Sequence, residues 1–474
     1  MKRVILFILL SLLNSVMAHA SFNEFQLQLV ANHYQLNYEL DVSGQSLLAS
    51  GVIRVKNISN EPADHIPLRL YRLLTVTAIT DLNGVGLPFD QQILNNDDWP
   101  LLQTNYIEIA LQRPLKPNES FSFNIEYSGY LKGYTETGME YVKDGITDNF
   151  SIIRMDAFAY PIVTYPNDTV NRQAKFWLHR YDYDVTVQVP IGYVVANGGQ
   201  LITSDIQSDK QAFRYTNKLP AWRMDFAIAK YQQYSNGNYQ VFSWESEQKS
   251  NALLAQISKT FALYQSWFGP LQQNLGYTFI EVPKNYGAQA DVTAVIQDAS
   301  GFNELNRVYH EISHQWNVKS LDVFSPRWDE GLATFLEYLT LDQMAGEGQL
   351  AGKTKQVLQQ IRQLPEKQPL YGETSFIDYG KAGLNSYSVG MVFYQLLYDL
   401  MGQNTFNKII GGFYQTHYQT GATTQTFIHY VKLNAGIDLT HFFDEWAYSA
   451  LFMKRIEQHH SYQQLLNFYR QKNK

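Results

Sequence analysis

Apolar and polar residues alternate along much of the first half of the chain. The alternation is clear in SGVIRVKNIS (50–59), FSFNIEYSG (121–129) and YDVTVQVP (183–190), and clusters of Gly, Pro and Asn separate such segments. A period of two is typical of strands that bury one face and expose the other to water. We therefore predict an antiparallel β domain over residues 21–236, ending at the turn-rich segment YSNGN (234–238).

The second half of the chain follows a helical pattern instead. A helical run at 248–267 is closed by Gly269 and Pro270, YTFIEVP (277–283) has the composition of one further strand, and helical periodicity dominates from about residue 302. The sequence thus predicts an α+β protein of more than one domain, with a mainly helical domain over residues 237–474.

The first twenty residues have the pattern of a secretory signal peptide. Lys2 and Arg3 precede an apolar run from Val4 to Leu13, and the triplet at 18–20 places a cleavage site after Ala20. The apolar run is too short to cross a bilayer. We therefore expect an exported protein, periplasmic or secreted, without stable membrane insertion after signal cleavage; the alternative is an uncleaved anchor.

The composition of the chain limits the partners, metal ligands and nucleophiles that the mature protein can use. The 474 residues carry a net charge of −7, and no basic cluster has the size of a phosphate-binding surface, so nucleic acid is not an expected partner. The chain has no cysteine, which excludes disulfides, thiolate ligands and a thiol nucleophile. Any bound metal ion must therefore be held by histidine and carboxylate side chains.

The segment VYHEISHQWNVKS (308–320) carries a candidate metal motif. We expect its helix to begin near Gly301, with Ser300 as the N-cap. The predicted apolar stripe consists of Leu305, Val308, Ile312 and Trp316. His310 and His314 then lie on the opposite face, one turn apart, where both imidazoles can reach one metal ion.

A third ligand separates a metal site from a chance pair of histidines on a surface helix. The segment SPRWDEGLATFLEYL (325–339) follows and predicts a second helix with two carboxylates seven residues apart on one face. Its apolar stripe consists of Leu332, Phe335, Leu336 and Leu339. We predict that Glu330 completes a site for one zinc ion, and that Glu337 accepts a hydrogen bond from a ligating histidine.

The same residues predict a hydrolytic mechanism. A zinc ion on two histidines and one carboxylate keeps a fourth position for water and lowers the pKa of that water to about 7. Glu311 follows His310 directly and would take the proton from the water, then pass it to the leaving amine.

The order of these motifs resembles the gluzincin zinc aminopeptidases of the alanyl-aminopeptidase and leukotriene-hydrolase type. HEISHQW (310–316) and WDEGLATFLEY (328–338) are similar to the two zinc helices of that family, and HQWNVKSL also resembles the glycyl aminopeptidases. The resemblance implies a saddle-shaped or sandwich-like β domain, a thermolysin-like catalytic domain and a peptide substrate. It identifies Tyr387, in SYSVGMVFYQLLYDLMG (386–402), as the donor to the oxyanion.

The chain also departs from the family pattern. The spacer of fifteen residues between His314 and Glu330 is shorter than usual. YGAQADVTAVI (286–296) takes the place of the strand that binds the substrate backbone and its free amine, which implies contacts from Gly287 and Ala288. The usual glutamate is replaced there by alanine, followed by Asp291, and a segment of the β domain offers Asp156 instead.

Three functions remain open from the sequence. The first is a zinc metallopeptidase that releases N-terminal residues from peptides. The second is an endopeptidase, or a peptidase with an unusual N-terminal preference, because the usual amine-binding glutamates are missing or moved. The third is a zinc-containing binding protein without peptidase activity. The large C-terminal helical domain of many relatives is expected to be absent, and the sequence does not indicate an oligomeric state.

Overall fold

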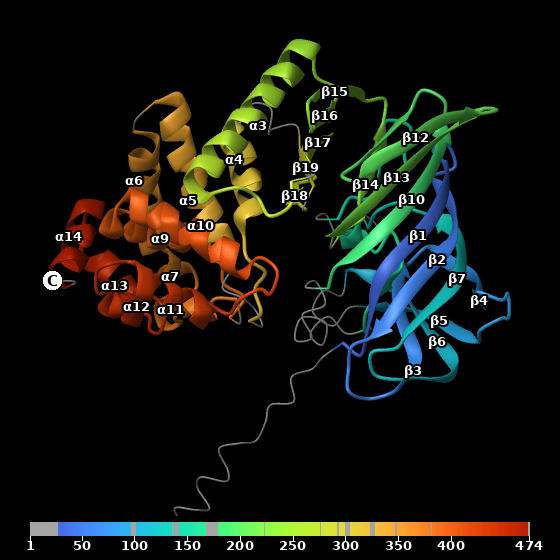
Figure 1. Ribbon diagram of the computed structural model, residues 1–474, viewed down its shortest axis with the longest axis horizontal. Helices are drawn as coiled ribbons and strands as arrows, with labels where there is room; N and C mark the ends of the chain where they lie inside the picture. Colours follow the sequence, from blue (N-terminus) through green and yellow to red (C-terminus); the bar gives the residue numbers. More distant parts are fainter. Residues whose placement is uncertain are drawn as a thin grey trace, which may run out of the picture.

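A computed structural model describes residues 27–472, except residues 96–100, 135–136, 138–141, 167–178, 222, 275, 292, 299–303, 323–327, 347 and 381. The predicted signal peptide, residues 1–20, lies outside the described residues, as do Ser300 and Gly301. Strands come first and helices dominate afterwards, and Figure 1 shows the β domain on the right and the helical domain on the left. This arrangement confirms the predicted fold class. No described helix combines the length and the apolar character needed to cross a membrane.

The largest sheet has seven strands in the order β12-β13-β10-β1-β2-β7-β4. Its strands are β1 (Leu29–Asp41), β2 (Ser46–Asn57), β4 (Leu74–Asp81), β7 (Ser120–Tyr130), β10 (Tyr181–Pro190), β12 (Gln200–Gln207) and β13 (Lys210–Ala221). Burial alternates residue by residue along β10, as the sequence predicts. One pairing of this sheet departs from the antiparallel pattern, because β1 and β10 run in parallel. Such a pair requires a long connection, and the intervening strands of the β domain provide it.

Two smaller sheets complete the β domain. A three-stranded sheet has the order β11-β14-β8, and a four-stranded sheet has the order β5-β6-β3-β9. Their strands are β11 (Val194–Asn197), β14 (Phe226–Ala229), β8 (Phe150–Ile153), β5 (Phe89–Asn95), β6 (Gln103–Leu115), β3 (Ala63–Tyr71) and β9 (Ile162–Val163). A 3-10 turn, η3 (Met155–Ala157), follows β8. Buried side chains of the seven-stranded and four-stranded sheets share one apolar core, so these two sheets form a sandwich.

A five-stranded sheet lies between the sandwich and the helices, in the order β15-β16-β17-β19-β18. Its strands are β15 (Gln232–Asn236), β16 (Tyr239–Ser243), β17 (Tyr277–Val282), β18 (Ala288–Ala290) and β19 (Ala294–Asp298). The predicted boundary after residue 236 lies in the turn of the β15–β16 hairpin, so this sheet extends across it. Among the strands that the structure describes, β18 pairs with β19 alone, antiparallel, and it therefore lies at an edge of the sheet.

The helical domain follows the five-stranded sheet. Its helices are α3 (Glu247–Phe268), α4 (Leu305–Ser313), α5 (Trp328–Ala345), α6 (Gln349–Arg362), α7 (Leu364–Lys367), α8 (Leu370–Glu373), α9 (Tyr387–Met401), α10 (Gln403–His417), α11 (Thr424–Asn434), α12 (Thr440–Trp446), α13 (Leu451–Gln458) and α14 (Tyr462–Lys472), with 3-10 turns η6 (His314–Trp316) and η7 (Phe376–Asp378). The run predicted at 248–267 is confirmed as α3, which is capped by the Ser246 hydroxyl and ends at Gly269 with φ 82°.

Alternate residues of the five-stranded sheet serve two different cores. Tyr277, Phe279 and Val295 belong to the core of the helical domain. Ile280 and Ile296 belong instead to a cluster shared with the three-stranded sheet of the β domain. Apolar contacts on both faces therefore fix the sheet, and with it the edge strand β18, between the two domains.

Glu281 is an ionisable group in the middle of this apolar sheet. Its residue is 3% exposed, and its Oε2 accepts a hydrogen bond from the backbone N–H of Trp244 at 2.9 Å. Burial raises the pKa of the Glu281 carboxyl to about 7. The group is therefore neutral in the folded protein under conditions where it is ionised in the unfolded chain.

We predict that Glu281→Gln removes a pH-dependent loss of stability. A carboxyl with a raised pKa in the folded state costs stability as the pH rises from its unfolded pKa toward about 7, and the loss is complete above that value. Relative to wild type, the variant should gain on the order of 2–3 kcal/mol between pH 5 and pH 8. Urea denaturation of both proteins at the two pH values measures this difference, and an equal offset at both would contradict the assignment.

Candidate metal centre and active site

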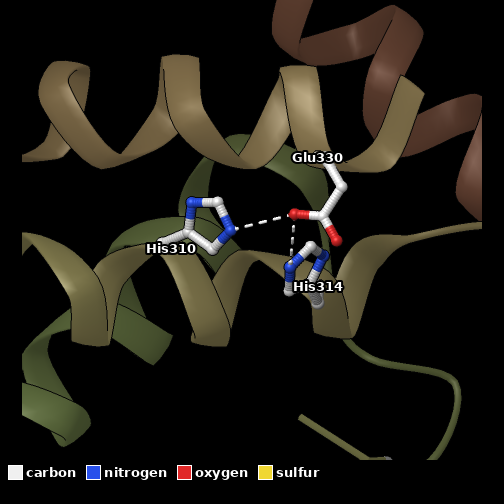
Figure 2. Close-up of side chains that lie close together, drawn as sticks. All are labelled: His310, His314 and Glu330. Carbon is white, nitrogen blue, oxygen red and sulfur yellow. Dashed lines mark hydrogen bonds and ion pairs between the residues drawn. The ribbon is translucent and has the colours of Figure 1, made fainter. Parts of the chain in front are cut away.

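Two helices bring the three predicted ligands together. His310 lies in α4, His314 in the η6 turn that follows it, and Glu330 near the start of α5. The Nε2 atom of His310 lies 3.2 Å from Oε2 of Glu330, and Nε2 of His314 lies 3.7 Å from the same oxygen, as Figure 2 shows. One potential ligand atom from each residue lies within 4.8 Å of the others.

This geometry fits a tetrahedral zinc site. Ligand atoms about 2.0–2.1 Å from a tetrahedral ion lie about 3.3 Å from one another. The separations of 3.2 and 3.7 Å between the imidazole nitrogens and the carboxylate oxygen are close to that value. Two imidazoles and one carboxylate leave a fourth position for water or substrate, which is the arrangement of catalytic rather than structural zinc sites. The shorter spacer before Glu330 therefore does not prevent the three side chains from converging.

Each imidazole is also held by a second partner. Nδ1 of His310 lies 3.2 Å from Oε2 of Glu337, and the Asn306 amide donates a hydrogen bond to the other oxygen of that carboxylate. Nδ1 of His314 lies 2.7 Å from the side-chain amide of Asn317. With Nε2 on a metal ion, each Nδ1 carries the proton and donates it. Glu337 accepts from His310, whereas the Asn317 amide, whose Nδ2 lies nearest Nδ1 of His314, accepts when it is flipped to present its oxygen.

The site is buried and its ionisable groups are strongly coupled. The side chain of His310 is 12% exposed. Burial alone would lower the pKa of His310, but the carboxylates of Glu330 and Glu337 outweigh burial and raise it to about 10. Burial likewise opposes ionisation of Glu330, while hydrogen bonds to His310 and Tyr387 keep its pKa below the usual value. A zinc ion must therefore displace a proton from His310, so metal binding should weaken as the pH falls.

Glu311 has the environment expected of a general base. It is 9% exposed and lies between the two histidine ligands in α4. Burial raises the pKa of the Glu311 carboxyl. The nearby imidazoles lower this pKa, and the other carboxylates of the site raise it further. A carboxylate with a raised pKa accepts a proton more readily at neutral pH.

A contact between two glycines brings Tyr387 to the metal ligands. A Cβ atom on Gly331 would lie 2.7 Å from the Cα of Gly390, so α5 and α9 approach more closely than any side chain allows. Glu330 directly precedes the first glycine, and Tyr387 lies one turn before the second. The Tyr387 ring stacks on His310 with centroids 6.1 Å apart and an interplanar angle of 11°. The structure thus places the predicted oxyanion donor beside the metal ligands.

The four predicted substrate-binding residues fall into two groups. Ala288 begins the edge strand β18, and Gly287 directly precedes it with φ 80°. Asp291 follows β18, and its carbonyl oxygen accepts a hydrogen bond at 3.0 Å from Gln315, a residue of η6. These three residues therefore lie beside the end of the zinc helix.

Asp156 lies apart from them, in the η3 turn of the β domain. Arg223 donates to both of its carboxylate oxygens, at 2.6 and 3.2 Å. Burial raises the pKa of Asp156, but the neighbouring guanidinium groups outweigh burial and lower it. Asp156 is therefore fully engaged by an arginine, which the sequence did not reveal because the two residues are far apart in the chain.

Some supporting residues could have been found in the sequence and others could not. Asn317 lies three residues after His314 in the zinc segment. A polar side chain at that spacing lies on the histidine face of the helix, so the sequence could have predicted its contact with His314. Gly331 and Gly390 are single glycines inside helical patterns, which often indicate a close approach of another backbone. Their pairing with each other depends on the tertiary fold.

We predict that Glu337→Gln weakens zinc binding by about tenfold or more, because the His310 imidazole loses the charge that orients it and raises its basicity. Competition with a chelator measures the zinc affinity. Glu373→Gln, at an exposed position of α8, is the matched control and should bind zinc as wild type does. Equal affinities for the two variants would show that Glu337 does not support the ligand.

We predict that Gly390→Ala separates α5 from α9 and costs about 1–3 kcal/mol of stability by overpacking. Zinc affinity should fall with it, because Glu330 moves with α5. Gly352→Ala is the control, since no atom lies within 4 Å of its added Cβ and alanine favours a helix by about 1 kcal/mol. Denaturation measures the stability of both variants, and zinc titration measures their zinc affinity. A Gly390→Ala protein with the stability and zinc affinity of wild type would refute the close-packing account.

Comparisons with known proteins agree with this site. Residues 293–446 match the family model described as the Peptidase family M1 domain. A mutant M1 zinc metallopeptidase from Deinococcus radiodurans, bound to a Tyr-Ser-Ala substrate, is 17% identical with a TM-score of 0.66; the match covers 89% of this chain and 94% of that one. A mutant two-domain M1 zinc metallopeptidase bound to L-arginine is 16% identical with a TM-score of 0.65 and 94% coverage of both chains. No curated protein sequence matches the chain.

The matched region contains both zinc helices and the start of α9, so the family match and the geometry concern the same residues. The two-domain neighbours share the β domain followed by the helical domain. The His-His-Glu cluster fits the single zinc ion of such enzymes. The protein is therefore a zinc metallopeptidase that carries a peptidase family M1 domain.

Proposed function

We propose that the protein is an aminopeptidase, which releases N-terminal residues from peptides. A zinc ion held by His310, His314 and Glu330 supplies a Lewis acid that polarises the scissile carbonyl and makes a water molecule acidic. The remaining chemistry belongs to the side chains around it.

Glu311 and Tyr387 perform the two further tasks that amide hydrolysis requires. Glu311 accepts the proton of the attacking water and later delivers it to the nitrogen of the leaving amine. The Tyr387 hydroxyl, next to the metal ligands, donates a hydrogen bond to the oxyanion that forms when the carbonyl is attacked. Removal of such a donor typically lowers the rate by about 10²–10³-fold.

The edge strand β18 offers the peptide a place to bind. One side of this strand pairs with β19, and its three residues are only partly buried. An extended peptide can hydrogen-bond to such a free edge as an additional strand. This supports the predicted backbone contacts at Gly287 and Ala288 and aligns the peptide along the end of the zinc helix.

The observation that carries the proposal is the group of acidic side chains next to β18. A small cavity between the β domain and this strand is lined by Arg223, Asp225, Gln289 and Asp291 among others. Around it, the described residues include four carboxylates and two guanidinium groups. These residues are Asp144, Asp156, Asp225 and Asp291 against Arg154 and Arg223. An unpaired ammonium is costly to bury, and a carboxylate beside β18 can provide its counter-charge.

The structural neighbours support the same conclusion. Their bound ligands are a tripeptide, L-arginine and, in a third structure with a TM-score of 0.61 and 16% identity, L-tryptophan, all of which carry a free α-amine. An endopeptidase would need no counter-charge for an amine. A binding protein without activity would need no general base beside its metal ligands.

We predict hydrolysis of amino-acid amides and of peptides with a free N-terminus, and no hydrolysis of N-acetylated peptides. The mature protein is assayed with added zinc against matched free and acetylated substrates. Glu311→Gln should bind zinc and lose the activity on all substrates. Asp291→Asn should raise KM for free-amine substrates, whereas Asp205→Asn, on the exposed strand β12, should not.

The alternatives give different results in this assay. Cleavage of acetylated peptides at rates similar to those of free peptides would identify an endopeptidase. A protein that binds one zinc ion and cleaves neither class would be a binding protein.

We also propose that the enzyme acts outside the cytoplasm, in the periplasm or as a secreted protein. The support is the signal-peptide pattern of residues 1–20. Sequencing the N-terminus of the protein recovered from cells tests this, and a protein that still carries residues 1–20 would contradict it.

A further inference from the structure

One guanidinium of the β domain reaches across to the strand that lies beside the zinc helix. Arg154 directly follows β8, and its side chain is 3% exposed. Its Nε donates to both carboxylate oxygens of Asp144, at 3.1 and 3.0 Å. Its Nη1 donates in the other direction, to the carbonyl oxygen of Tyr286 at 3.2 Å. Tyr286 lies two residues before β18, so one buried side chain connects the β domain to the start of this strand.

Further contacts reinforce this connection. The same Nη1 lies 3.5 Å from Oε1 of Gln289, the middle residue of β18. The Tyr286 hydroxyl donates to the carbonyl oxygen of Lys143 at 3.1 Å. The Tyr286 ring packs edge-on against Phe150, the first residue of β8, with centroids 5.1 Å apart and an interplanar angle of 78°. We call these contacts of Arg154 and Tyr286 the strand anchor.

The strand β18 is short and has little support of its own. It has three residues, all partly exposed, and among the described strands it pairs with β19 alone. Gly287, between Tyr286 and the strand, has φ 80°, and glycine gives the backbone additional freedom there. A short strand with a single partner is only marginally stable by itself. The strand anchor therefore contributes to fixing where β18 lies.

The β domain holds its side of the strand anchor rigidly. The N–H of Ile152 donates to the carbonyl oxygen of Gly145 at 3.1 Å, which joins β8 to the segment that carries Asp144. The carbonyl oxygen of Arg154 accepts a hydrogen bond from Ala159 at 3.1 Å. Asp144 is fully buried, and its carboxylate fixes the plane of the guanidinium. The donor that faces Tyr286 is therefore oriented before any substrate binds.

We propose that Arg154 is a positioning residue for substrate binding, which holds β18 where an extended peptide can pair with it. This rests on the proposed aminopeptidase function and extends it to the β domain. Arg154 acts through the backbone of the strand. The other end of the strand is held by Gln315 of η6, which donates to the Asp291 carbonyl oxygen at 3.0 Å. The two contacts together fix both ends of β18 relative to the metal ligands.

The test uses two variants that weaken the strand anchor from opposite sides. Arg154→Lys keeps a positive charge beside the buried Asp144, but one ammonium cannot reproduce the fork that also reaches Tyr286. Tyr286→Phe keeps the ring and removes only the hydrogen bond to Lys143. For tripeptides with a free N-terminus, Arg154→Lys should raise KM by about tenfold and Tyr286→Phe by about threefold to fivefold, with kcat within about twofold of wild type.

Matched controls make the same chemical changes elsewhere. Arg113→Lys alters an exposed arginine that pairs with Glu119 in the β domain, and Tyr448→Phe removes a hydroxyl that donates to Gln425 in the helical domain. Both controls should have the KM of wild type.

Amide hydrogen exchange tests the strand anchor without a substrate. Exchange of residues 286–290 should be at least about tenfold faster in Arg154→Lys than in wild type, because local opening of the strand becomes easier. Exchange in α4 and α5, and the zinc content, should equal those of wild type.

A merely structural role of Arg154 would reduce the amount of folded enzyme, which lowers the apparent kcat and leaves KM unaltered. That result, or unaltered exchange of residues 286–290 in Arg154→Lys, would overturn the inference and leave the aminopeptidase function intact. If wild type cleaves no peptide with a free N-terminus, the proposed function itself fails, and the positioning role fails with it.

Discussion

The active site depends on how closely α5 and α9 approach each other at Gly331 and Gly390. Each glycine occupies space that a Cβ atom of the other would need, with separations of 2.6–2.7 Å. Glu330 and Tyr387 extend from the two helices next to this contact. The distance between a metal ligand and the oxyanion donor is thus set by backbone packing and not by flexible side chains. Packed helices transmit such a constraint rigidly because protein interiors have few voids.

A second constraint comes from burying ionisable groups in an otherwise apolar domain. His310 is flanked by Glu330 on one ring nitrogen and by Glu337 on the other, so α4 and α5 are connected through one imidazole. These carboxylates favour a protonated histidine, and a divalent metal ion replaces that proton with a larger charge. The same burial raises the pKa of Glu311 and makes it a better base. The stability of the site and its chemistry therefore depend on the same excess of carboxylates.

Local sequence patterns predicted the features that depend on periodicity. Two histidines one turn apart and two glutamates two turns apart define faces of helices, and the structure shows those faces meeting. The features that were missed depend on partners far away in the chain. The parallel pairing of β1 with β10, the engagement of Asp156 by Arg223, and the contact of Gly331 with Gly390 join segments between about 60 and 150 residues apart. A hydrophobic pattern specifies which face of an element is buried, but not which element covers it.

The most direct test of this account is zinc X-ray absorption spectroscopy on the purified protein, together with its zinc content. The account predicts one zinc ion per chain, with two imidazole nitrogens at about 2.0–2.1 Å and carboxylate and water oxygens at about 2.0–2.2 Å. The signature of two imidazoles should be lost in His310→Ala and in His314→Ala. A spectrum without imidazole ligands, or an unaltered spectrum in either variant, would contradict the assignment of the metal centre.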